Sequence, residues 1–169
     1  MQNGNKLMVE TKNEILNLLT EIYDPEIPVL NIVEMGIVRD TFYENEKLII
    51  EITPTYSGCP AMKVIEDEIR DVMYLNGFKN VEVKKVYAPA WTTDWMTVET
   101  KNKLKNYGIA PPEGIAEKDF LKDQNKKSVE CPFCKSGKTK LTSHFGSTTC
   151  KSLHFCLECT QPFEHFKCI

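Results

Sequence analysis

Apolar residues recur at helical spacing in the middle of the chain, and the pattern stops at Asn76-Gly77, which is typical of a helix end. These positions predict a helix of about 16 residues; they are Met62, Ile65, Ile69, Val72 and Met73. Residues 47–53 are rich in β-branched side chains between turn formers, which indicates a largely buried strand. Residues 53–60 are therefore expected to form a tight polar loop that leads into a helix.

The first part of the chain predicts a helix and then a hairpin. Thr11 and Glu14 have the spacing of a capping box, and the apolar face that follows predicts a helix to about Tyr23. Residues 37–43 predict a strand that pairs with residues 47–53.

Regular structure is also expected after the central helix. Valines mark a third strand over residues 81–86, and a further helix is expected from about Thr93 to Tyr107, ending at Gly108. The order α-β-β-α-β-α predicts an α+β fold, a small mixed sheet with helices packed on it.

The cysteines divide the chain into two parts, because six of the seven lie from Cys131 onward. Residues 109–128 begin with a proline-rich break and continue with charged and amide side chains, which predicts a linker. We therefore expect one domain over residues 1–108 and a small module over residues 129–169.

Two Cys-x-x-Cys pairs dominate this module. Cys131 and Cys134 form the first pair, and Cys156 and Cys159 form the second. Two such knuckles can complete a closed tetrahedral site, so the tail predicts a zinc ribbon in which a zinc ion bound by all four cysteines is structural. An iron-sulfur cluster with the same four ligands is an alternative that the spacing leaves open.

Cys150 and Cys168 are left over. A strand over residues 150–156 would place Cys150, Ser152, His154 and Cys156 on one face, and a return strand could bring Cys168 close to Cys150. These two cysteines are thus a candidate second thiol pair, although two buried small residues explain them equally well. The three histidines are not expected to be ligands, because four cysteines already fill a zinc shell.

Cys59 stands alone in the first 128 residues. Pro60 suits the first position of the central helix, which places Cys59 at or beside its N-cap. Orphan N–H groups and the helix dipole favour a thiolate there, so we expect a lowered thiol pKa and a nucleophile or metal ligand. A small apolar filler is the alternative.

Two other segments could join Cys59. The turn with Asp24 and Glu26 and the segment ending at Trp91 each lie between two predicted elements. If all three meet at one end of the sheet, two carboxylates, a thiol and an indole would line one concavity. By composition alone, Asp24 is better explained as a turn former and Glu26 as a solvated charge, and Trp91 is otherwise an ordinary core aromatic.

The charge distribution is a weak guide to partners. The net charge is -3, while residues 129–169 hold five lysines against three glutamates. This gives no general attraction to nucleic acid or membranes. The polar N-terminus and the absence of an apolar run of roughly 18 residues predict a cytoplasmic protein.

Several motifs carry a resemblance to known families. Four stretches resemble the small iron-sulfur assembly family that includes SufT: Asp24-Pro25-Glu26-Ile27-Pro28, Ile32 to Val38, Thr53 to Pro60, and Ala88 to Trp95. The tail motifs resemble the PaaD family, the D subunits associated with bacterial phenylacetyl-CoA epoxidase complexes: Phe145 to Cys150 and Phe163 to Ile169. The resemblance covers residues from about 12 to 169.

The resemblance implies an accessory role without catalysis. Such a subunit would assist insertion of iron or an iron-sulfur cluster into a client of the phenylacetyl-CoA epoxidase system, in aerobic phenylacetate degradation. It implies metal transfer or client interaction by Cys59, Asp24, Glu26 and Thr53, with iron or a cluster held transiently. The implied partners are the iron-sulfur flavin reductase or the di-iron subunit of the complex, and a homodimer that shares Cys59 is a further option.

Three rival functions fit the same residues. They are a general iron-sulfur assembly adaptor, a thiol redox protein and a nucleic-acid-binding zinc ribbon. Catalysis of the epoxidation by this chain is not expected, because it has no Glu-x-x-His pair of the di-iron type and no glycine-rich dinucleotide fingerprint.

Overall fold

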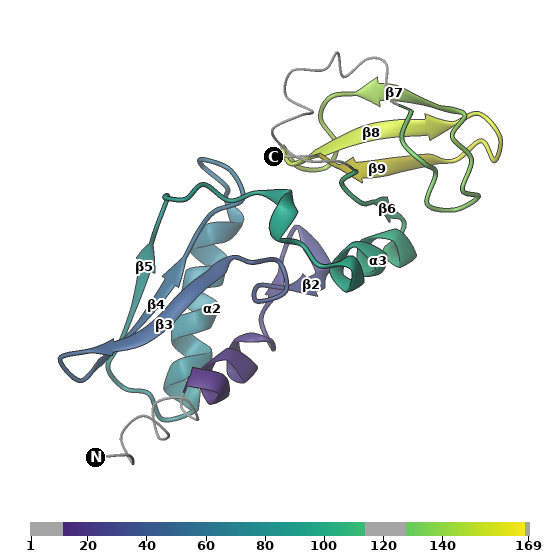
Figure 1. Ribbon diagram of the computed structural model, residues 1–169. Coiled ribbons are helices and arrows are strands. Elements are labelled where there is room, and N and C mark those ends of the chain that lie inside the picture. Colours follow the sequence, from purple (N-terminus) through teal and green to yellow (C-terminus); the bar gives the residue numbers. More distant parts are fainter. Residues whose placement is uncertain (1–11, 114–127, 168–169) are drawn as a thin grey trace. The chain divides into compact units, whose positions relative to one another are not determined.

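The computed structural model describes residues 12–113 and 128–167 (Figure 1). The chain divides into two compact units, one up to Trp91 and one from Thr92 onward. Within the described ranges, no helix is both long and apolar enough to cross a bilayer.

A mixed three-stranded sheet forms the centre of the first unit, as predicted. Strands β3 (Val38–Glu44) and β4 (Lys47–Ile52) form an antiparallel hairpin, and β5 (Val81–Lys85) lies parallel to β4. The hairpin turn consists of Asn45 and Glu46, both with positive φ, which matches the twist of the two strands.

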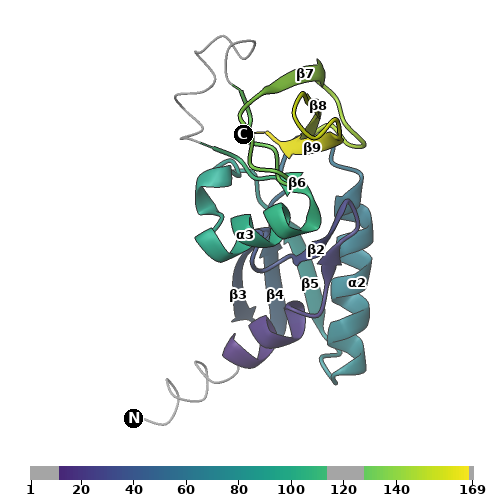
Figure 2. The same cartoon turned by 90° about the vertical axis from the view of Figure 1, so that its right-hand side faces the viewer.

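Helix α2 (Ala61–Leu75) packs against this sheet, and Figure 2 shows it running alongside the strands. Its buried face consists of the residues whose spacing predicts the helix, among them Met62, Ile65 and Ile69. Pro60 is the N-cap residue and not the first helical residue, so the helix begins one residue later than expected. Cys59 directly precedes the cap.

The first helix is shorter than predicted. It spans residues 12–19, and the prediction that it continues to Tyr23 is wrong. Tyr23–Asp24 instead forms strand β1, which pairs antiparallel with β2 (Ile27–Asn31), a strand that the sequence did not predict. The Asp24 carboxylate accepts the N–H groups of Glu26 and Ile27 and so holds the tight turn between the two strands.

The helix expected over residues 93–107 is interrupted. A single turn, η1 (Thr93–Trp95), precedes helix α3 (Val98–Tyr107). The break occurs because the Thr97 side chain accepts the N–H of Thr100 and caps a new helix. Gly108 ends α3 in the left-handed conformation, as predicted.

A four-stranded sheet in the order β6-β9-β8-β7 forms the ribbon of the second unit. Its strands are β6 (Ile109–Ala110), β7 (Thr139–Ser143), β8 (Lys151–Cys156) and β9 (Pro162–Phe166). The linker prediction is wrong for Ile109 and Ala110, because they pair with β9. Helix α3 runs directly into β6 and therefore belongs to the ribbon unit, whereas the sequence placed a boundary after Gly108. The rest of the predicted linker lies largely outside the described residues.

Candidate functional site

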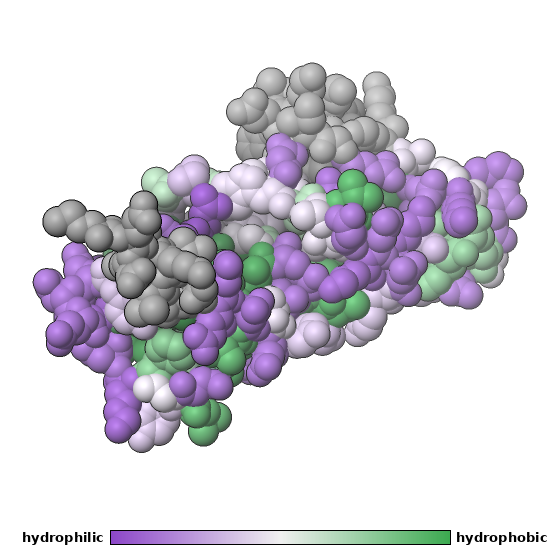
Figure 3. Space-filling view, turned by 60° about the horizontal axis from the view of Figure 1, so that its bottom comes forward, coloured by the Kyte–Doolittle hydropathy of each residue, from purple (hydrophilic) through white to green (hydrophobic). Residues whose placement is uncertain are grey.

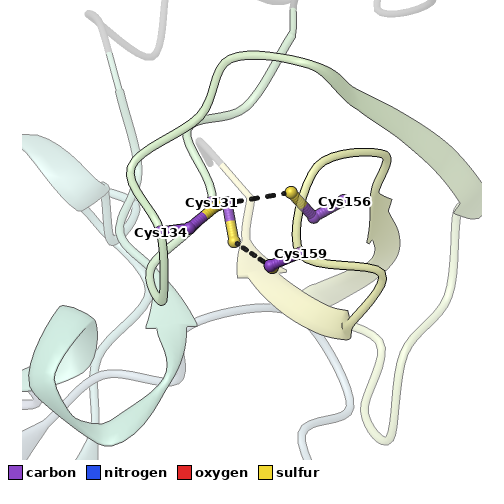
Figure 4. A group of neighbouring side chains, drawn as sticks. All are labelled: Cys131, Cys134, Cys156 and Cys159. Carbon is purple, nitrogen blue, oxygen red and sulfur yellow. Dashed lines mark hydrogen bonds between the residues drawn. The ribbon is translucent and has the colours of Figure 1, made fainter.

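Four cysteines from two turns come together in the ribbon (Figure 4). Their sulfur atoms all lie within 4.8 Å of one another. Cys131 and Cys134 come from the loop before β7, while Cys156 ends β8 and Cys159 lies in the turn before β9. The two predicted knuckles thus form one cluster, and the predicted metal ligands are the residues that compose it.

Backbone geometry shapes each knuckle. Lys135 donates its N–H to the carbonyl of Cys131, and both Lys135 and Thr160 have positive φ, which turns the chain back after each cysteine pair. The N–H groups of Cys159 and Glu158 point at the Cys156 sulfur and lower the pKa of that thiol to about 7. Burial raises the pKa of Cys159 to about 12. The backbone of this knuckle thus favours a thiolate at Cys156.

The sulfur separations fit a tetrahedral metal ion. Cys131 Sγ lies 3.7 Å from Cys159 Sγ, and Cys134 Sγ lies 3.5 Å from Cys156 Sγ. A tetrahedron with Zn–S bonds of about 2.3 Å has edges of about 3.8 Å. Among the described residues no histidine joins this cluster. The four thiols therefore suit a closed structural metal site.

Cys59 lies in the loop between β4 and α2. Its N–H bonds the carbonyl of Tyr56, and its own carbonyl accepts the N–H of Met62, so the loop turns tightly into the helix. Gly58 has a φ of +83°, and a Cβ at this position would meet nothing within 4 Å. The loop is therefore open at Gly58, whereas Cys59 itself is buried and only 8% exposed.

The electrostatic surroundings of Cys59 differ from the expectation. Burial raises the pKa of the Cys59 thiol, and the negative charges of Glu26 and Asp24 raise it further. The N–H of Ala61 and the Tyr56 side chain favour the thiolate, as a helix start should, but they are outweighed. The prediction of a lowered pKa is therefore wrong. The same interactions show that the acidic turn and the Cys59 loop lie together.

The other residues that the sequence analysis grouped with Cys59 each have a structural role. Asp24 is buried and holds the β1–β2 turn through its hydrogen bonds to two backbone N–H groups. Thr53 is buried, and its N–H bonds the carbonyl of Ile37. Trp91 is buried, and its indole N–H donates to the carbonyl of Met35 at 2.9 Å, which fastens the segment before residue 92 to the first unit.

The candidate second thiol pair is only half described. Cys150 is buried, and its sulfur lies 3.0 Å from the Thr148 hydroxyl, whereas Cys168 lies outside the described residues. The N–H of Lys167 bonds the carbonyl of Cys150, so Lys167 is the residue directly across from it. The face predicted from the sequence is present, since Ser152, His154 and Cys156 are all buried.

Tyr56 is a site residue that the sequence analysis did not single out. Its side chain interacts with the Cys59 thiol, and the two residues are the ends of one tight turn in which the N–H of Cys59 bonds the carbonyl of Tyr56. The spacing Tyr-x-x-Cys before a helix start is the signal that could have identified it, because such a turn returns the chain onto the cysteine.

Two family patterns match the chain in the order of its two units. The pattern described as "Iron-sulfur cluster assembly protein" matches residues 12–84, and the pattern described as "PaaD zinc beta ribbon domain" matches residues 116–167. The ribbon match agrees with the cysteine cluster.

Relatives and a solved structure agree with this division. An Escherichia coli K12 protein, provisionally named as the D subunit of 1,2-phenylacetyl-CoA epoxidase, is 48% identical over 93% of this chain and 93% of its own length. The Bacillus subtilis protein named Fe-S protein maturation auxiliary factor YitW is 36% identical over 55% of this chain and 92% of its own. A crystal structure of a DUF59 domain from Bacillus anthracis aligns with a TM-score of 0.55 at 28% identity, over 60% of this chain and 97% of that one.

Proposed function

The chain belongs to the PaaD family, which includes the E. coli protein provisionally named as the D subunit of 1,2-phenylacetyl-CoA epoxidase, and on this premise we propose a maturation function for it. In this proposal the protein is a non-catalytic accessory subunit of an epoxidase system for phenylacetyl-CoA. It assists insertion of iron or an iron-sulfur cluster into a client subunit. The iron-sulfur assembly pattern over residues 12–84 supports this function.

The observation that carries the proposal is the meeting of Cys59 with Glu26 and Asp24. Two carboxylates beside a buried thiol keep it protonated and at the same time attract cations. When a cation such as ferrous iron binds, the thiol gives up its proton and the sulfur becomes a ligand. In this proposal a cargo would approach along the loop at Gly58, where a Cβ would meet nothing within 4 Å.

The two cysteine sites suit different tasks. Four thiols in the ribbon surround a metal completely, which favours retention, whereas Cys59 contributes one sulfur and leaves other positions to the cargo or a partner. We therefore assign structural zinc to the ribbon and transient binding to the first unit, with Cys59, Asp24, Glu26 and Thr53 as its site residues.

The partners in this proposal are the iron-sulfur flavin reductase or the di-iron subunit of the complex. They would be met in the cytoplasm, where thiols stay reduced. A second copy of the chain could supply another Cys59 to the same cargo.

The test is a client-loading assay with a Cys59→Ser variant. Each purified apo subunit of the epoxidase is incubated anaerobically with ferrous iron, sulfide and this protein, reisolated, and assayed for iron. We expect Cys59→Ser to abolish the gain in client iron while its own zinc and folding stay normal. Cys150→Ser serves as a control, because that buried cysteine lies outside both sites. Normal client iron with Cys59→Ser would refute the proposal.

A further inference from the structure

The loop between β7 and β8, residues 144–150, is fastened by polar contacts to the ribbon sheet. The N–H of Gly146 bonds the carbonyl of Lys151, and Glu164 accepts both the N–H and the hydroxyl of Ser147. A Cβ at position 146 would lie 2.6 Å from Glu164 Oε1, so a larger residue there would require the Glu164 side chain to shift. These contacts hold the loop against strands β8 and β9.

A partly buried ion pair lies beside the loop. Lys151 is 3% exposed, its Nζ lies 3.0 Å from Glu164 Oε2, and the Glu164 side chain is 23% exposed. Burying two charges costs desolvation energy that their attraction repays only in part, so such a pair is weak evidence for stability. In this ribbon the pair fixes where the Glu164 carboxylate lies, and the same carboxylate accepts the N–H of Ser147 in the loop.

The result of this fastening is an exposed aromatic ring. Phe145 is 63% exposed. The Nζ of Lys167 lies 5.0 Å from the ring centre of Phe145 and donates to the carbonyl of His144 at 3.2 Å. A large apolar side chain on a preorganised loop is typical of an interface hot spot, because little conformational entropy is lost on binding.

Among the residues that the structure describes, a single cation, Lys167, lies against the Phe145 ring. All three glutamates between residues 128 and 167 are engaged in ion pairs with lysines: Glu130 with Lys105, Glu158 with Lys138, and Glu164 with Lys151. Within the described residues, Lys167 forms no ion pair. Figure 3 shows one face of the molecule, which is mostly hydrophilic with hydrophobic residues in separate groups.

We propose that Phe145 and Lys167 form a docking surface for a partner protein that offers an apolar pocket with a carboxylate rim. This goes beyond metal transfer at Cys59, and it rests on the proposed function in one respect: the partner is a subunit of the epoxidase. Nucleic acid fits less well, because residues 128–167 contain no arginine and binders of single strands stack several bases on aromatic rows.

The test measures binding of the full-length protein to each purified epoxidase subunit. Phe145→Ala should weaken binding to one subunit about thirtyfold, the change that a hot spot of about 2 kcal/mol implies. Lys167→Gln should weaken the same binding and flatten its salt dependence. Leu157→Ala is the matched control, since Leu157 is 55% exposed on a knuckle of the same ribbon and should bind as wild type. Unchanged zinc content and circular dichroism establish that each variant is folded.

The outcomes separate docking from transfer. Docking is supported if Phe145→Ala loses affinity while Cys59→Ser binds normally and fails only in client loading. Wild-type affinity of Phe145→Ala overturns the docking surface and leaves transfer at Cys59 standing. A Phe145-dependent change in self-association, or in binding to a labelled single-stranded oligonucleotide, identifies a different occupant and also overturns it. Absence of wild-type binding to every subunit refutes both the docking surface and the proposed partners.

Discussion

The sulfur of Cys131 lies 3.7 Å from the sulfur of Cys159, although 28 positions separate the two residues in the chain. Cys131 and Cys156 are also members of the small apolar core of the ribbon, together with Ala110, Val129 and Phe163. The metal ligands and the core are thus partly the same residues. A module of this size has little other apolar area to bury, so its folding should depend on the metal.

Loss of one ligand should unfold the ribbon selectively. Structural zinc contributes on the order of 10 kcal/mol to such modules, so Cys131→Ser should lose zinc and expose the ribbon to protease while the first unit stays folded. Zinc content, far-UV circular dichroism and limited proteolysis measure this, with Cys150→Ser as the control. An unchanged spectrum and protease pattern in Cys131→Ser would contradict the prediction.

Removing the charge of Glu26 should make Cys59 more reactive. The pKa of Cys59 is higher in the folded chain than its ordinary value of 9.0, partly because of Glu26. Glu26→Gln should therefore shift the pH profile of Cys59 alkylation to lower pH, as followed by mass spectrometry of the Cys59 peptide. The raised pKa also means that the protonated thiol favours folding below about pH 9, and this contribution is lost as the pH rises through the folded pKa. An identical alkylation profile in Glu26→Gln would show that burial alone sets the pKa.

Asp24 should separate a structural from an electrostatic role. Asp24→Ala leaves the N–H groups of Glu26 and Ile27 without their acceptor and should lower the free energy of unfolding by about 1–3 kcal/mol. Asp24→Asn keeps an acceptor oxygen and should be nearly as stable as wild type, while client loading falls because the negative charge is gone. Urea denaturation and the loading assay give the two readouts. Equal stability of the Ala and Asn variants would show that these two hydrogen bonds do not stabilise the fold.

The ion pair beside the Phe145 loop should be costly to break on one side. Lys151→Met leaves the Glu164 charge without its cation and should destabilise the ribbon, by less than the roughly 3 kcal/mol of a fully buried pair because Glu164 is partly exposed. The double variant Lys151→Met with Glu164→Gln should recover part of this loss, because no uncompensated charge then remains. A thermodynamic cycle of the single and double variants measures the coupling. Additive effects would mean that the two residues act independently.

The sequence identifies features that depend on local pattern. Cys-x-x-Cys spacing identified the four-cysteine site, because one turn presents both sulfurs of a knuckle. Helical periodicity identified α2 within one residue of its start. The hairpin of β3 and β4 followed from strands separated by a short turn. The PaaD and SufT resemblance, confirmed by the family patterns, joined these parts into one protein family.

Features that depend on tertiary contacts escaped prediction. Strand β2 contains Pro28, and although Asp24 could be recognised as a turn former, nothing local indicates that its turn joins two paired strands. The thiol pKa was expected to fall because the helix start alone was considered, whereas burial and Glu26 act through the folded structure. The Lys151–Glu164 pair joins two strands and has no signal in either one.

The most direct test of the central claim is the metal and sulfide content of the anaerobically reconstituted protein beside its Cys59→Ser variant. Both proteins are expected to retain ribbon zinc, and wild type should in addition hold a labile iron species, visible in its absorption spectrum, that Cys59→Ser lacks. If both proteins hold zinc alone, Cys59 carries no iron or cluster, and the account of this protein as a metal-transfer subunit is contradicted.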